Sequence, residues 1–215
     1  MTDAYFSMDG HVAPLDRLLQ ICRKHDSFLM IDEAHSTGVF GKKGRGMTEH
    51  FGLFDKVDVV MGTLSKALGS VGGFIAGRAL LRESLINSSR TFIYTTAPVP
   101  AASAAATESL RIIRSEPARR KKLWEGVKRL REGLGALGLD LMSSEGPIIP
   151  VFIGDTRKAL RVEECMKKER IFAPVIRPPT VPSGTDRLRF SVTALHERED
   201  FDRLLGVIRK MKDQI

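Results

Sequence analysis

The chain has 215 residues, 42% of them hydrophobic and 28% charged, with a net charge of +8 and two cysteines far apart in sequence. This composition excludes a disordered chain, a collagen-like chain and a disulfide-stabilised scaffold, and it predicts a globular protein with one or two hydrophobic cores. The first residues form neither a basic nor an apolar stretch, and no segment reaches membrane-spanning length. We therefore expect a cytoplasmic protein without a membrane partner.

The first part of the chain is predicted to form an α/β layer with a mostly parallel sheet. A helix is expected from Pro14, because apolar residues recur at helical spacing after it and proline is tolerated in a first turn. An apolar strand at residues 28–31, a glycine-rich loop at 38–46, a short helix and a second strand at 57–61 follow. Glycines within residues 69–77 let the backbone pass close to a cofactor before a further strand. This alternation of helices and strands is typical of α/β proteins.

Two long helices are expected after residue 100, one rich in alanine and one containing Trp124. The second begins with the densest basic run, residues 119–122, after which apolar residues recur at helical spacing. We interpret this run as the solvated side of the helix, and not as a nucleic-acid-binding surface. Basic residues elsewhere in the chain would still attract a phosphorylated substrate electrostatically, without forming a base-reading surface.

Strands and helices alternate again in the last part of the chain. We expect strands at residues 148–153, 172–176 and 187–192, a helix at residues 161–170 and a final helix. In the strand at 187–192, period-two alternation places Arg187 and Arg189 opposite an apolar face. An arginine fork there is suited to bidentate binding of an amino-acid carboxylate.

Two motifs carry the chemistry, residues 31–38 (IDEAHSTG) and residues 62–67 (GTLSKA). Each begins where an apolar run gives way to polar residues, which places their polar side chains at the carboxyl ends of two strands. Ligands of open α/β sheets bind at that edge. The four candidate residues are Asp32, His35, Thr63 and Lys66. A carboxylate, an imidazole, a hydroxyl and a lysine there suit pyridoxal phosphate, an aldehyde cofactor whose ring nitrogen must stay protonated.

The first motif could also be interpreted as part of a helicase or as a zinc site, but the sequence lacks the further residues that either would need. The letters DEAH at residues 32–35 also spell a magnesium-binding box of helicases, but no phosphate-binding loop of the form GxxxxGK[ST] occurs in the sequence. A zinc site is disfavoured, because Asp32 and His35 lack the HExxH spacing and no cysteine pair is nearby.

Each candidate residue has a role that follows from its chemistry. Lys66 is suited to form the Schiff base with the cofactor aldehyde, and Asp32 to pair with the pyridine nitrogen and favour its protonated form. His35 is placed to reach the phenolic oxygen of the ring, and Thr63 to hydrogen-bond the phosphate.

Six short motifs together resemble the α-oxoamine synthases, pyridoxal-phosphate enzymes of the aspartate aminotransferase fold (fold type I). They are residues 7–10 (SMDG), 32–38 (DEAHSTG), 44–46 (GRG), 62–67 (GTLSKA), 72–73 (GG) and 193–196 (TALH). The resemblance implies that residues 1–112 are the C-terminal part of the large cofactor-binding domain. It also implies that residues 113–215 are a small C-terminal α+β domain.

The resemblance also implies roles for residues at matching positions. Lys66 would be the internal aldimine and Asp32 the partner of the pyridine nitrogen, with Ser7 and His35 near the phenolic oxygen and Thr63 on the phosphate. Arg189 would bind the substrate carboxylate. Because the family forms homodimers with active sites at the interface, Thr95 or Thr96 would contact the phosphate in the partner subunit's site.

The family joins an amino acid to an acyl thioester with loss of carbon dioxide. Residues 147–151 and 176–182 (IRPPTVP) most resemble the branch that condenses L-alanine with a pimeloyl thioester, carried on coenzyme A or an acyl carrier protein, in biotin biosynthesis. Two alternatives stay open. One is condensation of glycine or serine by another member of the family, and the other is a non-catalytic remnant or partner module that needs a separate N-terminal half.

The chain departs from the family in two respects. His11 stands where the family usually has an aspartate, which we expect to have a modest local effect. The resemblance begins near the middle of the family's chain, so we expect a truncated protein that lacks several strands of the parallel sheet. Unpaired strand edges and uncovered apolar faces predict that the polypeptide alone is sticky, binds the cofactor weakly and turns over little substrate.

Overall fold

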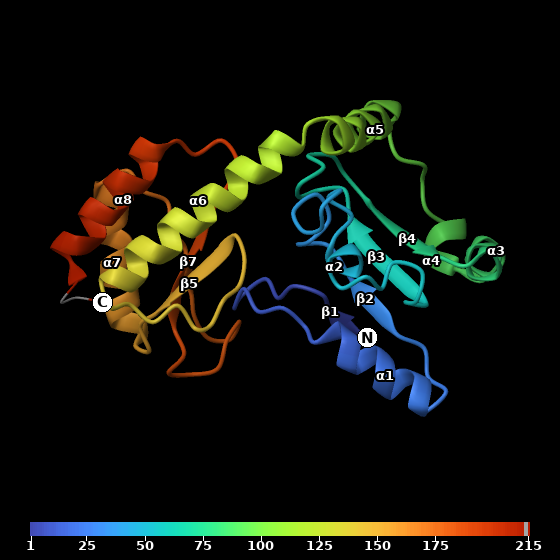
Figure 1. Cartoon of the computed structure of the whole chain (residues 1–215), viewed down its shortest axis with the longest axis horizontal. Helices are drawn as coiled ribbons and strands as arrows, with labels where there is room; N and C mark the ends of the chain where they lie inside the picture. The colour runs from blue at the N-terminus through green and yellow to red at the C-terminus, as the bar shows by residue number, and fades with distance from the viewer. Residues whose placement is uncertain (213–214) are drawn as a thin grey trace. The chain divides into compact units, whose positions relative to one another are not determined.

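The computed structural model describes residues 1–212 and residue 215, and it divides the chain into two compact units (Figure 1). The first unit contains residues 1–5 and 13–117, and the second contains residues 6–12 and 118–215. The division after residue 117 lies slightly beyond the expected boundary after residue 112. Residues 6–12 belong to the second unit although they precede most of the first, an arrangement that a single boundary cannot express.

A four-stranded sheet organises the first unit. Its strands are β1 (Thr2–Asp3), β2 (Met30–Asp32), β3 (Val59–Thr63) and β4 (Gly73–Gly77), in the order β1-β2-β3-β4. β1, β2 and β3 run parallel to one another and β4 is antiparallel to β3, so the expected mostly parallel α/β sheet is confirmed. The register pairs Asp3 with Asp32, the last residues of β1 and β2, and it pairs Asp32 with Met61 in the middle of β3.

Five helices accompany this sheet in the described part of the first unit. They are α1 (Leu15–Lys24), α2 (Met47–His50), α3 (Ala79–Ser88), α4 (Arg90–Ile93) and α5 (Pro100–Ser115). α1 buries Leu15 and Leu19, which contribute to a core with Ile31 of β2. In contrast, α3 and α4 contain no buried residue, and they lie near the outer strand β4 (Figure 1).

The second unit combines a three-stranded antiparallel sheet with three helices. The sheet has the order β5-β7-β6, formed by β5 (Ile148–Phe152), β6 (Val175–Ile176) and β7 (Arg187–Ser191). The helices are α6 (Pro117–Ala136), α7 (Thr156–Lys168) and α8 (Arg198–Lys210). Each helix buries apolar residues, among them Leu134, Met166 and Ile208 with no exposed area.

Two boundaries in this unit differ from the sequence prediction for local reasons. The strand expected at residues 172–176 shrinks to β6, because Pro174 has no N–H to donate, and Phe172 is 83% exposed. α7 begins five residues before the expected position 161 (161 − 156 = 5). Asp155 caps it, since its Oδ1 accepts a hydrogen bond from the Lys158 N–H at 2.7 Å.

Among the described residues, no helix combines the length and the apolar character that a membrane crossing requires.

Candidate functional site

Asp32, at the end of β2, and Lys66, in the segment after β3, both act on the carboxyl of Asp3 at the end of β1. Asp32 is the last residue of β2 and is half-buried, and its Oδ1 accepts a hydrogen bond from the Ala34 N–H at 2.7 Å. Burial raises the pKa of the Asp3 carboxyl, and the negative charge of Asp32 raises it further, while the ammonium of Lys66 lowers this pKa. The structure therefore brings Asp32 and Lys66 into one electrostatic environment, together with Asp3.

Glu33 fixes the backbone that carries Asp32 and His35. Its side chain is 1% exposed, and its carboxylate accepts hydrogen bonds from the N–H groups of Met47 and Thr48, both at 2.7 Å, and from the Thr48 hydroxyl at 2.9 Å. The Ser36 hydroxyl also donates to it. Two of these donors are backbone N–H groups at the start of α2, which have no partner within the helix itself. A negative charge is favoured at this end of a helix. Glu33 thereby ties the turn after β2 to the start of α2.

His35 lies in this turn, three residues after Asp32, and is half-buried. The turn is closed by the N–H groups of Ser36 and Thr37, which donate to the Glu33 carbonyl oxygen at 3.0 and 2.9 Å. The imidazole therefore follows the same end of β2 as the Asp32 carboxylate, and β3 is the neighbouring parallel strand. The structure places His35 in the same unit as Asp32, Thr63 and Lys66.

Thr63 ends β3, and Lys66 is exposed in the turn that follows it. The Thr63 hydroxyl lies 2.8 Å from the Ser65 hydroxyl and donates to the Gly72 carbonyl oxygen at 3.1 Å. A Cβ at Gly73 would lie 2.9 Å from the Gly62 carbonyl oxygen, so the two strands approach closely only because residue 73 is glycine. The backbone around Thr63 and Lys66 is therefore held in a defined shape.

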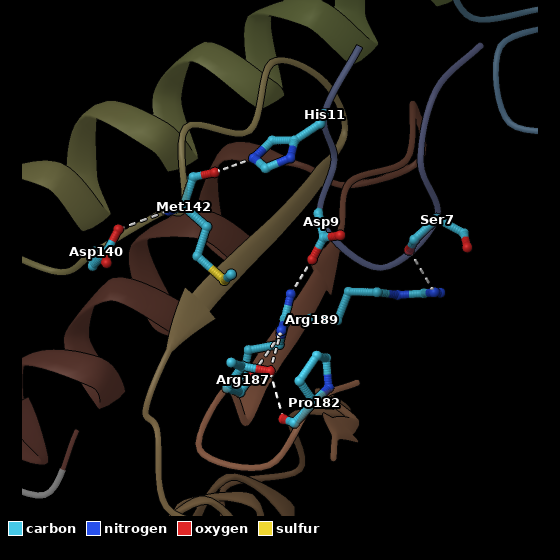
Figure 2. A network of polar contacts seen from close by, with 9 residues as sticks. Ser7, Asp9, His11, Asp140, Met142, Pro182, Arg187 and Arg189 are labelled. Carbon is cyan, nitrogen blue, oxygen red and sulfur yellow. Dashed lines mark hydrogen bonds and ion pairs between the residues drawn. The ribbon is translucent and has the colours of Figure 1, made fainter. Parts of the chain in front are cut away.

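Ser7 and Arg189 belong to the second unit, where they contact each other (Figure 2). Arg189 projects from β7, and its Nη1 donates to the Ser7 carbonyl oxygen at 3.0 Å. Its Nε is buried and has no hydrogen-bond partner among the described residues. A buried donor without a partner is unusual in folded proteins, so this N–H stands out as one that could receive an acceptor.

Arg187, in contrast to Arg189, uses its guanidinium in contacts within the chain. It is 3% exposed and forms an ion pair with Asp9, while its Nε and Nη2 donate to the carbonyl and hydroxyl oxygens of Thr185 at 2.8 and 2.9 Å. The sequence placed both arginines on a face suited to a carboxylate ligand. The structure leaves Arg189 with an unpartnered donor and commits Arg187 to Asp9.

Thr95 and Thr96 are both exposed in the segment between α4 and α5. Their expected contact is with a partner subunit, so this role stays a prediction. Among the described residues, no cluster of three or more histidine, cysteine or acidic side chains is arranged to hold a metal ion.

Three acidic residues of these networks had no assigned role in the sequence interpretation, although two of them lie within its motifs. Glu33 follows Asp32 directly, and Asp9 belongs to the SMDG motif at residues 7–10, but Asp3 had no motif to mark it. Burial of Glu33 was signalled only by its position between an apolar strand and a turn. The partners of Asp9 and Asp3 come from distant parts of the chain, and no local spacing indicates them.

The sequence matches the aminotransferase class I and II family over residues 1–208, and the chain belongs to this family. Within it, the chain is 50% identical over 210 residues to 8-amino-7-oxononanoate synthase of Thioalkalivibrio sulfidiphilus, a match that covers 97% of this chain and 53% of that protein. These relationships confirm the expected family.

Solved structures support the same assignment. A structure of serine palmitoyltransferase (SPT) with its PLP internal aldimine superimposes with a TM-score of 0.95 at 32% identity, covering 99% of this chain and 54% of that chain. For 8-amino-7-oxononanoate synthase from Francisella tularensis the TM-score is 0.87 at 29% identity, with coverage of 99% and 62%. The expected fold type is confirmed, and the chain spans about half the length of the relatives it matches.

Proposed function

We propose that this chain carries the lysine-bearing half of the active site of a pyridoxal-phosphate-dependent acyltransferase. In this proposal the enzyme condenses L-alanine with a pimeloyl thioester, the reaction of the branch that residues 176–182 resemble, and a relative 50% identical to the chain is named 8-amino-7-oxononanoate synthase. The observation that carries the proposal is the parallel pairing of β2 and β3, which brings Asp32 and Lys66 to one edge of the sheet. That edge is where ligands bind in α/β sheets.

The residues of the first unit fit the cofactor in type and placement. A carboxylate, an imidazole, a hydroxyl and an ammonium follow two adjacent strand ends, and close-packed glycines bring the backbone near them. When bound, pyridoxal phosphate supplies an electron sink for the negative charge that forms at the α-carbon of an amino acid.

Each side chain then has a defined task. The Asp32 carboxylate would hold a proton on the ring nitrogen, because an adjacent negative charge stabilises the cationic form. His35 would hydrogen-bond the phenolic oxygen and Thr63 would bind the phosphate, and the family resemblance assigns Ser7 to the phenolic oxygen as well.

Lys66 would hold the cofactor through its side-chain nitrogen, and its amine would serve as the general base that takes the α-proton of the substrate. Arg189 would bind the substrate carboxylate through its guanidinium. In a homodimer, Thr95 or Thr96 would reach the phosphate of the partner's site.

The test is cofactor binding and product formation by the purified chain, alone and mixed with the unmatched half of the Thioalkalivibrio sulfidiphilus relative. We expect a visible absorbance band with pyridoxal phosphate that borohydride fixes covalently to Lys66, and carbon dioxide release from L-alanine and pimeloyl-coenzyme A in the mixture. Lys66→Ala should abolish both, whereas Lys24→Ala, at an exposed position of α1, should change neither. Absence of the band and of product in both preparations would overturn the proposal and favour a non-catalytic module.

Condensation of serine is the second candidate reaction. The higher TM-score of 0.95 with SPT favours it, while the 50% sequence identity with 8-amino-7-oxononanoate synthase favours alanine. Comparing carbon dioxide release from L-alanine, L-serine and glycine in the same mixture decides between them.

A further inference from the structure

Residues 6–12 form a short segment that is fastened to the second unit at several points (Figure 2). The Ser7 carbonyl oxygen accepts from Arg189, the Asp9 carboxylate pairs with Arg187, and the Gly10 carbonyl oxygen accepts from the Glu145 N–H at 2.8 Å. His11 Nε2 is hydrogen-bonded to the Met142 carbonyl oxygen. We call residues 6–12 the docked segment.

Close backbone contact holds the docked segment against β5 as well. Gly10 has a φ of +64°, and a Cβ built there would lie 2.3 Å from the carbonyl oxygen of Ile148, the first residue of β5. Only glycine fits at this position. The segment is therefore placed against two neighbouring strands, β5 and β7.

The ion pair between Asp9 and Arg187 joins a partly exposed carboxylate to a buried guanidinium. Arg187 is 3% exposed, and Asp9 is the acidic side chain that neutralises it, with two further guanidinium donors satisfied by Thr185. A buried guanidinium that loses its anion is strongly unfavourable, so the pair fixes where Asp9 sits. Ser7 lies two residues before Asp9, and its carbonyl oxygen is thereby fixed too.

Arg189 depends on this arrangement. One of its guanidinium nitrogens is held by the Ser7 carbonyl oxygen at 3.0 Å, and its buried Nε has no partner among the described residues. A guanidinium that is already oriented binds a carboxylate more tightly, because less side-chain freedom is lost on binding.

We infer that Asp9 and Arg187 are positioning residues, which set the guanidinium of Arg189 for a carboxylate ligand by docking residues 6–12 on β7. This inference rests on the proposed function, in which Arg189 holds the substrate carboxylate. Asp9 and Arg187 touch neither the cofactor nor the substrate in this scheme, and they act through Ser7.

The test follows the Arg189 Nε–H signal by ¹⁵N NMR in the full chain without cofactor, during titration with propionate, which is alanine without its amine. Arg189→Lys assigns the signal. We expect propionate to shift it in the wild type, and Asp9→Asn to weaken propionate binding about tenfold, the size expected when a charge-assisted contact is lost. Asp9→Glu should restore part of the affinity. The matched control Asp16→Asn, at an exposed position of α1, should leave it unchanged.

A second readout examines the docked segment itself. The Gly10 N–H donates to the Phe6 carbonyl oxygen at 3.0 Å, and its hydrogen exchange should accelerate about tenfold in Asp9→Asn, but not in Asp16→Asn. Equal propionate affinity in the wild type and Asp9→Asn, or no response of Arg189 to propionate, would overturn the inference.

Failure of the proposed function gives a different result. That failure shows as absence of the Lys66-dependent absorbance band and of product in both preparations, and the propionate titration does not involve Lys66 or the cofactor. That absence, together with Asp9-dependent propionate binding, would reject the acyltransferase and support the positioning role.

Discussion

Glu33 shows how a single buried carboxylate organises the candidate site. It accepts four hydrogen bonds and joins the turn after β2, which carries Asp32 and His35, to the start of α2. Because both carboxylate oxygens face donors, an amide at this position would direct an N–H₂ group at one or more of them.

Glu33→Gln should therefore lower the free energy of unfolding by roughly 2 kcal/mol, since buried donors lose their acceptor. It should also weaken pyridoxal phosphate binding by loosening Asp32. Urea unfolding and cofactor titration measure the two effects. Glu83→Gln, at a side chain 64% exposed, is the control and should alter neither. Equal stability of the two variants would contradict the role assigned to Glu33.

Asp3 is a residue whose charge opposes folding. Burial first, and then the negative charge of Asp32, raise its pKa above the ordinary value of 3.8, while Lys66 counteracts them. The folded chain therefore binds this proton more tightly than the unfolded chain. The contribution of Asp3 to stability is largest below pH 3.8 and declines as the pH rises through the raised pKa.

Asp3→Asn removes this titration while keeping the shape of the side chain. The stability of the variant relative to the wild type should increase as the pH rises from 3.8 through the raised pKa, and then level off. Urea unfolding at a series of pH values up to neutrality measures the difference. Asp16→Asn provides the baseline. A difference that is constant with pH would contradict the raised pKa.

At the scale of elements, the start of α7 depends on one cap. Asp155 accepts the Lys158 N–H at 2.7 Å, and this bond satisfies one of the unpaired donors of the first turn. Asp155→Ala should cost about 1 kcal/mol of stability in thermal or urea unfolding. Asp155→Ser keeps a hydrogen-bond acceptor at this position and should lose clearly less stability than Asp155→Ala. Equal losses of stability in the two variants would show that the capping hydrogen bond contributes nothing.

At the scale of the whole molecule, exposed apolar side chains gather on the α3–α4 region. They include Leu80 at 80%, Phe92 at 60% and Tyr94 at 79% exposure. These values are large for a helix pair next to an outer strand, because such helices normally bury one face.

We expect the purified chain to self-associate through this surface in a concentration-dependent manner. The double variant Leu80→Lys with Phe92→Lys should reduce association in light scattering, with little change in unfolding free energy, because α3 and α4 bury no residue. Phe172→Lys, at a phenylalanine of the second unit that is 83% exposed, is the control. A reduction of the same size in the control would assign association to another surface.

Much of the fold is predictable because helical and strand periodicity are local properties. The apolar runs predicted β2, β3, β5 and β7 to within two residues at each end, and the helical spacing predicted α1, α6 and α8. Local chemistry also explains the errors. Pro174 shortens β6, and Asp155 makes α7 begin earlier than expected. In both cases a single residue shifts the boundary, and how far it shifts depends on the surrounding backbone.

The sequence by itself determined the family, the fold type and the identity of the chemical groups, since motifs and periodicity are written in consecutive residues. Only the tertiary structure decided which groups meet. Asp9 and Arg187 form an ion pair although 178 residues separate them in sequence. The charges of Asp32 and Lys66 act on the carboxyl of Asp3. Residues 6–12 belong to the second unit although they lie near the start of the chain. Such pairings depend on long-range packing, and for this reason Arg187 is committed to Asp9 while Arg189 keeps an unpartnered donor.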